Sequence, residues 1–328
     1  MYEALYYEVL TDQRVHCLLC PHGCLIKEGK RGICWGRHNI GGKLYSEFYA
    51  QTISIANDPI EKKPLYHFYP GTYILSIGAN GCNLRCQFCQ NWEISQERSP
   101  TTELTPKEAV ETALRYKSIG IAYTYTEPFM WYEYVLDTAQ LARSAGLKNV
   151  MVTNGYVNEA PLRQLLPYVD AMNIDLKSFR NDFYHKICGG KLEPVLEAIK
   201  IAQAACQVEL TTLLVTDTND TMDEINDLTD WIVKLNPEIP LHFSRYFPRY
   251  KMTNPPTPLA TLQRAGNIAQ NKLKYVYLGN VADKESNCTY CPKCKIRLIE
   301  REGYYVQKQL VKNSKCPVCK AYVPVIGS

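Results

Sequence analysis

The sequence contains no apolar run that approaches the ~18 residues of a membrane-spanning helix. Its first residues, Met-Tyr-Glu-Ala-Leu-Tyr-Tyr-Glu, include acids and form no apolar stretch of the signal-peptide kind. Internal repeats and low-complexity segments are missing, and the net charge of +4 is too small to indicate a partner. With 328 residues, 46% of them hydrophobic, the chain suits about two domains and is too apolar for a disordered protein. We therefore expect a soluble cytoplasmic protein without a membrane partner.

Cysteine, by contrast, is abundant and clustered. Of 14 cysteines, eleven form three groups: the N-terminal thiols (Cys17, Cys20, Cys24 and Cys34), the central thiols (Cys82, Cys86 and Cys89) and the C-terminal thiols (Cys291, Cys294, Cys316 and Cys319). Cys206, which follows two alanines, is expected in the core, and Cys288 is a spare thiol. Because cytoplasmic thiols stay reduced, the close spacing within the groups indicates metal binding rather than disulfides.

The middle of the chain alternates apolar strand patterns with amphipathic helix patterns. The predicted strands are Tyr73–Gly78, Ile121–Tyr125, Val150–Thr153, Ala171–Leu176, Val208–Val215, Leu241–Tyr246 and Tyr275–Leu278. The predicted helices are Thr105–Gly120, Phe129–Ala145, Glu159–Tyr168, Leu192–Cys206, Thr221–Leu235 and Leu259–Gln270, with capping boxes at Thr105 and Thr221. This alternation is typical of an α/β fold with a parallel sheet.

A partial or full β/α barrel is the predicted architecture, with a doubly wound open sheet as the alternative. Polar residues follow four different strands, and a barrel collects such residues at one mouth, at the C-terminal ends of its strands. We expect three parts: a Cys-rich N-terminal segment over 1–60, the β/α core over 61–283 and a small domain over 284–328.

The central thiols have the spacing C-x3-C-x2-C directly after the first predicted strand. Three thiolates on a short loop can hold three irons of a 4Fe–4S cluster and leave the fourth iron without a protein ligand. S-adenosylmethionine could chelate that iron, and an electron from the cluster would then generate a 5′-deoxyadenosyl radical able to abstract hydrogen from a C–H bond. A zinc site completed by a distant ligand is the alternative.

At these residues the sequence resembles the radical SAM superfamily, and within it the pyruvate formate-lyase activating-enzyme-like proteins of the AmmeMemoRadiSam system. The segments that carry the resemblance include CLLCPHGCLIKEGKRGICWGR, NDPIEKKPLYHFYPG, GCNLRCQFCQNWEIS, YTYTEPF, VTNGY, NIDLKSF, CGGKLEPVL, VELTTLLV, PLHFSRYFP and YVYLGNV. The resemblance implies an oxidoreductase-like enzyme with a 4Fe–4S cluster and S-adenosylmethionine as cofactors.

The resemblance also implies cofactor-binding residues at the strand ends. Thr126 lies where the family has a Gly-Gly-Glu-like segment, here without the glycine pair, and Glu127 could instead cap the next helix. Asn154 and the pair Asp175 and Lys177 match segments that face ribose or methionine, although Asn-Gly is also a common turn and the pair could be a structural ion pair. Cys188 is expected to be buried and inert, with a reactive thiol near the radical as the alternative.

The C-terminal thiols form two C-P-x-C turns of the zinc-ribbon kind, with short strands at Ile296–Ile299 and Tyr304–Val306 between them. Four thiolates suit zinc or iron, and the ion would supply folding energy to this small domain. The N-terminal thiols offer a further set of four ligands for zinc or a second 4Fe–4S cluster, and His22 could replace one of them.

The favoured function is a radical SAM enzyme that abstracts hydrogen from a protein, as glycyl-radical activating enzymes do, or from a small molecule. It requires a low-potential electron donor. Modification of RNA with the ribbon as a docking module is a second hypothesis, but a basic-aromatic stripe is missing, so a nucleic-acid partner is not favoured. A non-catalytic zinc-rich scaffold is the third.

Overall fold

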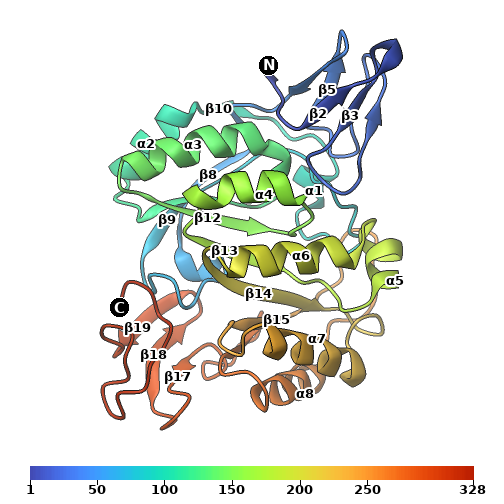
Figure 1. The fold of residues 1–328 in the computed structure, drawn as a ribbon. Helices are drawn as coiled ribbons and strands as arrows, with labels where there is room; N and C mark the ends of the chain where they lie inside the picture. Colours follow the sequence, from blue (N-terminus) through green and yellow to red (C-terminus); the bar gives the residue numbers. More distant parts are fainter.

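The protein, described over residues 1–328 by a computed structural model, is built around one eight-stranded sheet with the order β16-β15-β14-β13-β12-β11-β9-β8 (Figure 1). Its strands are β8 (Ser54–Pro59), β9 (Tyr73–Gly78), β11 (Gly120–Tyr123), β12 (Lys148–Thr153), β13 (Ala171–Asp175), β14 (Gln207–Leu214), β15 (Leu241–Arg245) and β16 (Val276–Gly279). Neighbours from β9 to β16 are parallel, and β8 runs antiparallel to β9. The predicted α/β class with a mostly parallel sheet is confirmed.

The longer helices lie on one face of this sheet (Figure 1). They are α2 (Pro106–Arg115), α3 (Tyr132–Ser144), α4 (Glu159–Leu165), α6 (Leu192–Gln203), α7 (Met222–Leu235) and α8 (Leu259–Gln270), and α1 (Trp92–Ser95) and α5 (Asn181–Phe183) are short. From β9 to β16 each strand is added beside its predecessor, so the strand order does not reverse. A doubly wound sheet has such a reversal, which this strand order lacks. The edge strands β8 and β16 are not paired, so the strands do not form a closed ring.

The two predicted capping boxes differ in outcome, because one depends on neighbouring residues alone and the other meets a contact from elsewhere in the fold. At α2 the Thr105 side chain accepts from Glu108 N and the Glu108 carboxylate accepts from Thr105 N (2.7 Å), which confirms the first capping box. At α7 Thr221 caps as predicted, but the Glu224 carboxylate accepts from Phe179 N (2.8 Å) instead of closing the box. The reason is tertiary: the loop after β13 brings an unpaired backbone donor to this buried carboxylate.

The N-terminal segment forms small antiparallel sheets at one end of the molecule (Figure 1). One contains β2 (Tyr7–Val9), β3 (Val15–Cys17) and β4 (Leu25–Ile26), another contains β1 (Tyr2–Glu3), β6 (Lys43–Ser46) and β5 (Arg37–Ile40), and β7 (Gln51–Thr52) pairs with β10 (Thr102–Glu103). Because β8 belongs to the central sheet, that sheet begins before the boundary predicted at residue 60.

The C-terminal residues form a three-stranded antiparallel sheet of β17 (Thr289–Tyr290), β18 (Arg297–Glu302) and β19 (Tyr305–Gln309). Its small apolar core includes Leu298, Ile299 and Val323, and it packs against Tyr66 and Tyr277 of the β/α part. The module is therefore attached to the central sheet rather than tethered beside it. None of the helices in the molecule has the length and apolarity needed to cross a membrane.

Candidate functional site

The central thiols lie on the loop that leaves β9. This loop is fixed by backbone hydrogen bonds, from Gly81 N to Ile94 O (2.8 Å) and from Arg85 N to Cys188 O (2.7 Å). Gly81 has a φ of +93°, and a Cβ there would lie 2.4 Å from the Cys34 carbonyl oxygen, so this position requires glycine. All three central thiols line one cavity of about 440 Å³ at the C-terminal ends of the strands. The structure thus brings the predicted cluster ligands together.

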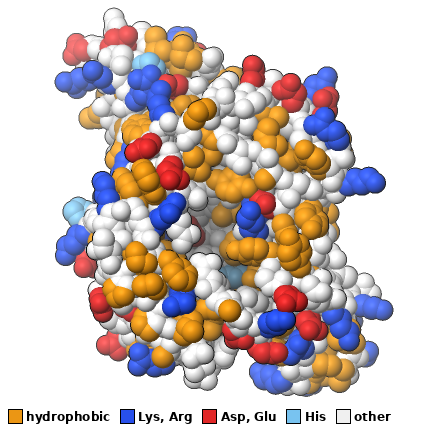
Figure 2. Space-filling model, turned by 180° about the vertical axis from the view of Figure 1, so that it is seen from behind, with side chains coloured by type: hydrophobic (Ala, Val, Ile, Leu, Met, Phe, Trp, Pro, Cys, Tyr) orange, Lys and Arg blue, Asp and Glu red, His pale blue; other side chains and the backbone are white.

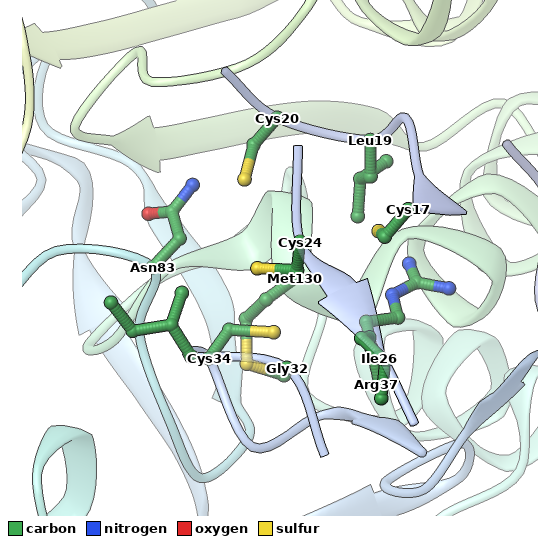
Figure 3. Close-up of a pocket in the computed structure, with 11 residues that line it drawn as sticks. Cys17, Leu19, Cys20, Cys24, Ile26, Gly32, Cys34, Arg37, Asn83 and Met130 are labelled. Atoms are coloured by element: carbon green, nitrogen blue, oxygen red, sulfur yellow. The ribbon is translucent and has the colours of Figure 1, made fainter. Parts of the chain in front are cut away.

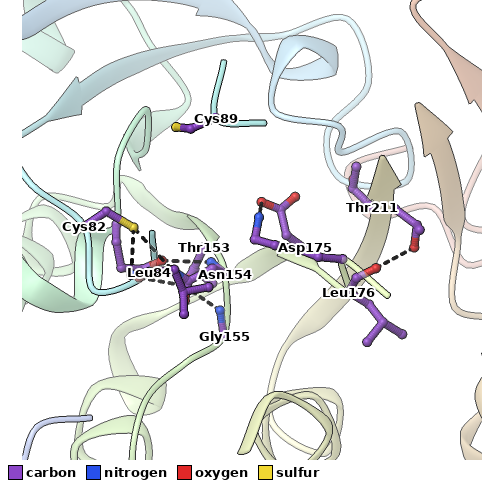
Figure 4. Close-up of polar contacts among 12 residues, drawn as sticks. Cys82, Leu84, Cys89, Thr153, Asn154, Gly155, Asp175, Leu176 and Thr211 are labelled. Atoms are coloured by element: carbon purple, nitrogen blue, oxygen red, sulfur yellow. Dashed lines mark hydrogen bonds and ion pairs between the residues drawn. The ribbon is translucent and has the colours of Figure 1, made fainter. Parts of the chain in front are cut away.

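The central thiols fit an iron–sulfur cluster better than a single ion. Their sulfur atoms do not form a compact set within 4.8 Å, as the C-terminal thiols do, and Figure 4 shows Cys82 and Cys89 on separate sides of the site. A cluster suits this spacing because it binds each thiolate to a different iron. Burial raises the pKa of Cys82 well above its usual value, so metal binding is needed to hold the thiolate. No fourth cysteine lines the cavity, so a four-iron cluster held there would have one iron without a cysteine ligand.

Polar residues from the strand ends face the same cavity. Four of the five predicted cofactor-binding residues line it: Thr126, Asn154, Asp175 and Lys177. Asn154 Nδ2 donates to Asn83 Oδ1 (2.9 Å) and lies 3.6 Å from the Cys82 sulfur (Figure 4). Lys177 Nζ lies 2.8 Å from Asp175 Oδ2, so the ion pair considered from the sequence is formed in the cavity wall. These groups surround the central thiols with amide, carboxylate and ammonium groups.

Glu127 does not line the cavity. Its side chain is buried and accepts hydrogen bonds from Phe129 N (3.0 Å), Thr153 Oγ1 (2.7 Å) and Asn154 N (2.8 Å). Burial raises the pKa of Glu127 to about 7. The carboxylate therefore caps the short helix Pro128–Trp131, as the sequence alternative had it, and holds the backbone of Asn154 in place.

Several cavity residues were not predicted from the sequence. Lys63 lines the cavity, is almost fully buried, and its Nζ lies 2.7 Å from Asp58 Oδ2, which also accepts from Tyr125 OH (2.7 Å). Burial lowers the pKa of Lys63 to about 8. Tyr304, from the turn between β18 and β19, completes the cavity rim. Figure 2 shows the face turned away from the helices, hollowed near its centre and bordered by hydrophobic side chains.

Cys188 is fully buried within hydrogen-bonding reach of Cys86, but it does not line the cavity. Its carbonyl oxygen supports the loop of the central thiols, as described above. Cys206 is half-buried after α6 and packs against the main core, in agreement with its predicted place. Neither residue adds a ligand to the cavity.

The C-terminal thiols form a compact metal-binding set. Their four sulfur atoms all lie within 4.8 Å of one another, with 3.4 Å between Cys291 and Cys319 and 3.7 Å between Cys294 and Cys316. Bonds of about 2.3 Å to one tetrahedral ion require sulfur separations of about 3.8 Å. Cys288 stands outside the set, with its thiol 3.2 Å from the Lys284 carbonyl oxygen. A four-cysteine site for one ion is therefore present.

The N-terminal thiols line a separate cavity next to the central loop. His22 does not line it, and its Nε2 lies 2.6 Å from the carbonyl oxygen of Asn83. The structure therefore brings the four cysteines together without His22, which instead contacts the backbone beside Cys82.

Comparisons with known proteins find a family model, a relative that spans the whole chain and a structure of similar fold. Residues 76–232 match the family model described as Radical SAM superfamily. An uncharacterized protein of Methanocaldococcus jannaschii is 48% identical over 337 residues, covering 99% of this chain and 100% of the relative. The structure of TYW1 with a lysine-pyruvate adduct bound has a TM-score of 0.50 at 15% identity, over 72% of this chain and 90% of that one, and so is similar in fold.

Two enzymes match over a shorter region. The GTP 3′,8-cyclase of Peptoclostridium acidaminophilum is 31% identical over 175 residues, 51% of this chain and 53% of that protein. The pyruvate formate-lyase-activating enzyme of Clostridium pasteurianum is 27% identical over 118 residues, 33% of this chain and 48% of that enzyme. The chain thus spans about half the length of each of these two relatives.

Proposed function

The chain belongs to the radical SAM superfamily, and on this premise we propose that it is an enzyme that reductively cleaves S-adenosylmethionine and abstracts a hydrogen atom from a substrate. The observation that carries the proposal is the set of three cysteines, without a fourth, around the cavity at the strand ends. A 4Fe–4S cluster bound there would supply the electron that converts S-adenosylmethionine to methionine and a 5′-deoxyadenosyl radical.

The residues around the cavity would bind the cluster and the cofactor. The central thiols would hold three irons, and Lys177 would offset part of the negative charge that three thiolates bring into a buried site. Asn154 and the Asp175–Lys177 pair are placed to bind the polar groups of the cofactor, since they line the cavity beside Cys82. Glu127 acts through Asn154 and is a positioning residue.

For the substrate, we propose the backbone or side chain of a partner protein, with this chain placed in the AmmeMemoRadiSam branch. The partial similarity to a pyruvate formate-lyase-activating enzyme supports this assignment, together with the segments quoted above. The test uses an extract of cells grown in fully deuterated medium, so that proteins and metabolites are both labelled, separated into a dialysed protein fraction and a small-molecule filtrate. We expect deuterium in the 5′-deoxyadenosine product when the protein fraction is added. If deuterium is found only with the filtrate, the substrate is a small molecule and not a protein.

Three further features belong to the proposal. The strands and helices form a partial β/α barrel, because the strand order is sequential and the helices lie on one face. The C-terminal module is a zinc ribbon, whose sulfur separations suit one tetrahedral ion. A low-potential one-electron carrier would serve as reductant.

The experiment for the reaction is anaerobic reconstitution with iron and sulfide, reduction with dithionite, and quantification of 5′-deoxyadenosine from S-adenosylmethionine. The reconstituted chain should form 5′-deoxyadenosine, and Cys86→Ala should form none. Cys206→Ala is the matched control and should retain the activity, since Cys206 lies outside the cavity. A reconstituted, reduced protein that leaves S-adenosylmethionine intact would refute the proposal.

A further inference from the structure

The four N-terminal thiols converge although they come from separate segments. Cys17 ends β3, Cys20 lies in the turn after it, Cys24 precedes β4 and Cys34 precedes β5. All four line one enclosed cavity, and Figure 3 shows their side chains arranged around it. The pairing of β3 with β4 and the backbone hydrogen bond from Cys17 N to Cys24 O (2.9 Å) hold the first three together. Chance placement of free thiols does not explain this arrangement.

A buried cation with unused donors faces the same cavity. Arg37 is 1% exposed and lines the cavity, with its Nη1 2.7 Å from Glu133 Oε1. Its Nε and Nη2 have no hydrogen-bond partner. Leaving donors of a buried guanidinium unpaired is costly, so an acceptor is expected at this place. Four thiolates around a metal centre carry net negative charge and offer sulfur acceptors to these donors.

The spacing distinguishes this site from the C-terminal one. The sulfurs of the C-terminal thiols all lie within 4.8 Å, whereas the N-terminal thiols form no such compact set. A single zinc ion requires sulfur separations of about 3.8 Å, because each Zn–S bond is about 2.3 Å long. A cubane cluster binds each thiolate to a different iron and therefore takes ligands that stand farther apart. We propose that the N-terminal thiols hold a second 4Fe–4S cluster, with all four irons ligated by cysteine.

This second site is adjacent to the first. Asn83 lines the cavity of the N-terminal thiols, and its neighbour Cys82 lines the other cavity. Gly81 approaches the Cys34 carbonyl so closely that no side chain fits between them. Asn83 Oδ1 also accepts from Asn154, which faces the Cys82 sulfur. The second cluster would thus lie next to the cluster that gives its electron to the reaction and could supply that electron. This role rests on the proposed function, whereas the site itself does not.

The test counts metal in the full-length protein after anaerobic reconstitution. The decisive sample carries Cys82→Ala, Cys86→Ala and Cys89→Ala together, which leaves the N-terminal thiols for a cluster and the compact C-terminal thiols for a single ion. It should retain about four iron and four sulfide per chain and, after reduction, the EPR signal of a 4Fe–4S cluster. The wild type should contain about eight iron. Changing the N-terminal thiols to serine in the triple variant should remove the remaining iron, while the control Cys206→Ala in that background should retain it.

A triple variant that binds no iron, with either a second zinc ion or no metal at the N-terminal thiols, would overturn the proposal. This result does not depend on folding of the serine variant, because the triple variant leaves the N-terminal segment unchanged. The two proposals also fail separately. Iron retained in the triple variant, together with no 5′-deoxyadenosine from the wild type, would refute the reaction and leave the second cluster in place.

Discussion

Arg301 connects the C-terminal module to the β/α part through a fully buried ion pair. Its Nε lies 3.4 Å from Glu61 Oε1, and its Nη2 donates to the Tyr66 carbonyl oxygen (2.7 Å); both charged side chains are 0% exposed. Removing one partner of a buried pair costs about 3–5 kcal/mol, because the other charge remains buried without compensation. Arg301→Met should therefore lower the free energy of unfolding by about 3–5 kcal/mol. It should also weaken substrate binding, since Tyr304 on the same module forms part of the cavity rim.

The control is Arg297→Met on the same strand. Arg297 is 38% exposed and pairs with Glu285 and Glu300 at the surface, where solvent screens the charges, so its removal should destabilise far less than the removal of Arg301. Denaturant unfolding of both variants measures the difference. Adding Glu61→Gln to Arg301→Met should restore part of the loss, because no buried charge then remains. If the two arginine variants unfold at the same denaturant concentration, the buried pair does not hold the module and the reasoning is wrong.

Three further predictions concern stability and metal content. Burial lowers the pKa of His67 to about 4, below the value of about 6.5 in an unfolded chain. The unfolded state therefore binds the proton first, and the free energy of unfolding should fall as the pH decreases from 6.5 towards 4. His67→Gln should reduce this dependence on pH in denaturant titrations, and an unchanged dependence would contradict the assignment. Gly81→Ala should destabilise the protein more than Gly146→Ala, because both glycines have positive φ but only a Cβ at Gly81 would lie within 4 Å of other backbone atoms. If the two variants lose the same stability in thermal unfolding, the close approach at Gly81 is refuted. Cys294→Ser should lose one metal ion per chain in elemental analysis and expose the C-terminal module to protease, whereas the control Cys288→Ser should keep the ion. Retention of the ion by both variants would exclude the four-thiolate site.

The central strands and helices could be predicted because their apolar patterns are long and regular. The start of α2 was predictable from Thr105 and Glu108, because this cap involves only residues that are neighbours in the sequence. The N-terminal sheets were not predictable, since several of their strands have only two to four residues and show no period. β8 reads SIANDP, without alternation, and is a strand because β9 offers it a free edge.

The candidate site was predictable where chemistry depends on spacing. The three groups of metal-binding cysteines could be predicted from the spacing of the cysteines in the sequence. Polar residues at strand ends could be expected to lie close together because parallel strands end on the same edge. Lys63 and Tyr304 could not be found in this way, because they reach the cavity from segments far away in sequence. The inward turn of Glu127 depends on the backbone donors of Phe129 and Asn154, which only the folded chain brings to it.

The central claim is that the cluster on the central thiols keeps one iron open for S-adenosylmethionine. The most direct measurement is the EPR spectrum of the reconstituted, dithionite-reduced protein with and without S-adenosylmethionine. We predict that the cofactor shifts the signal of this cluster, and that the Cys82→Ala/Cys86→Ala/Cys89→Ala protein shows no such shift. A wild-type signal that is identical with and without S-adenosylmethionine would contradict the account.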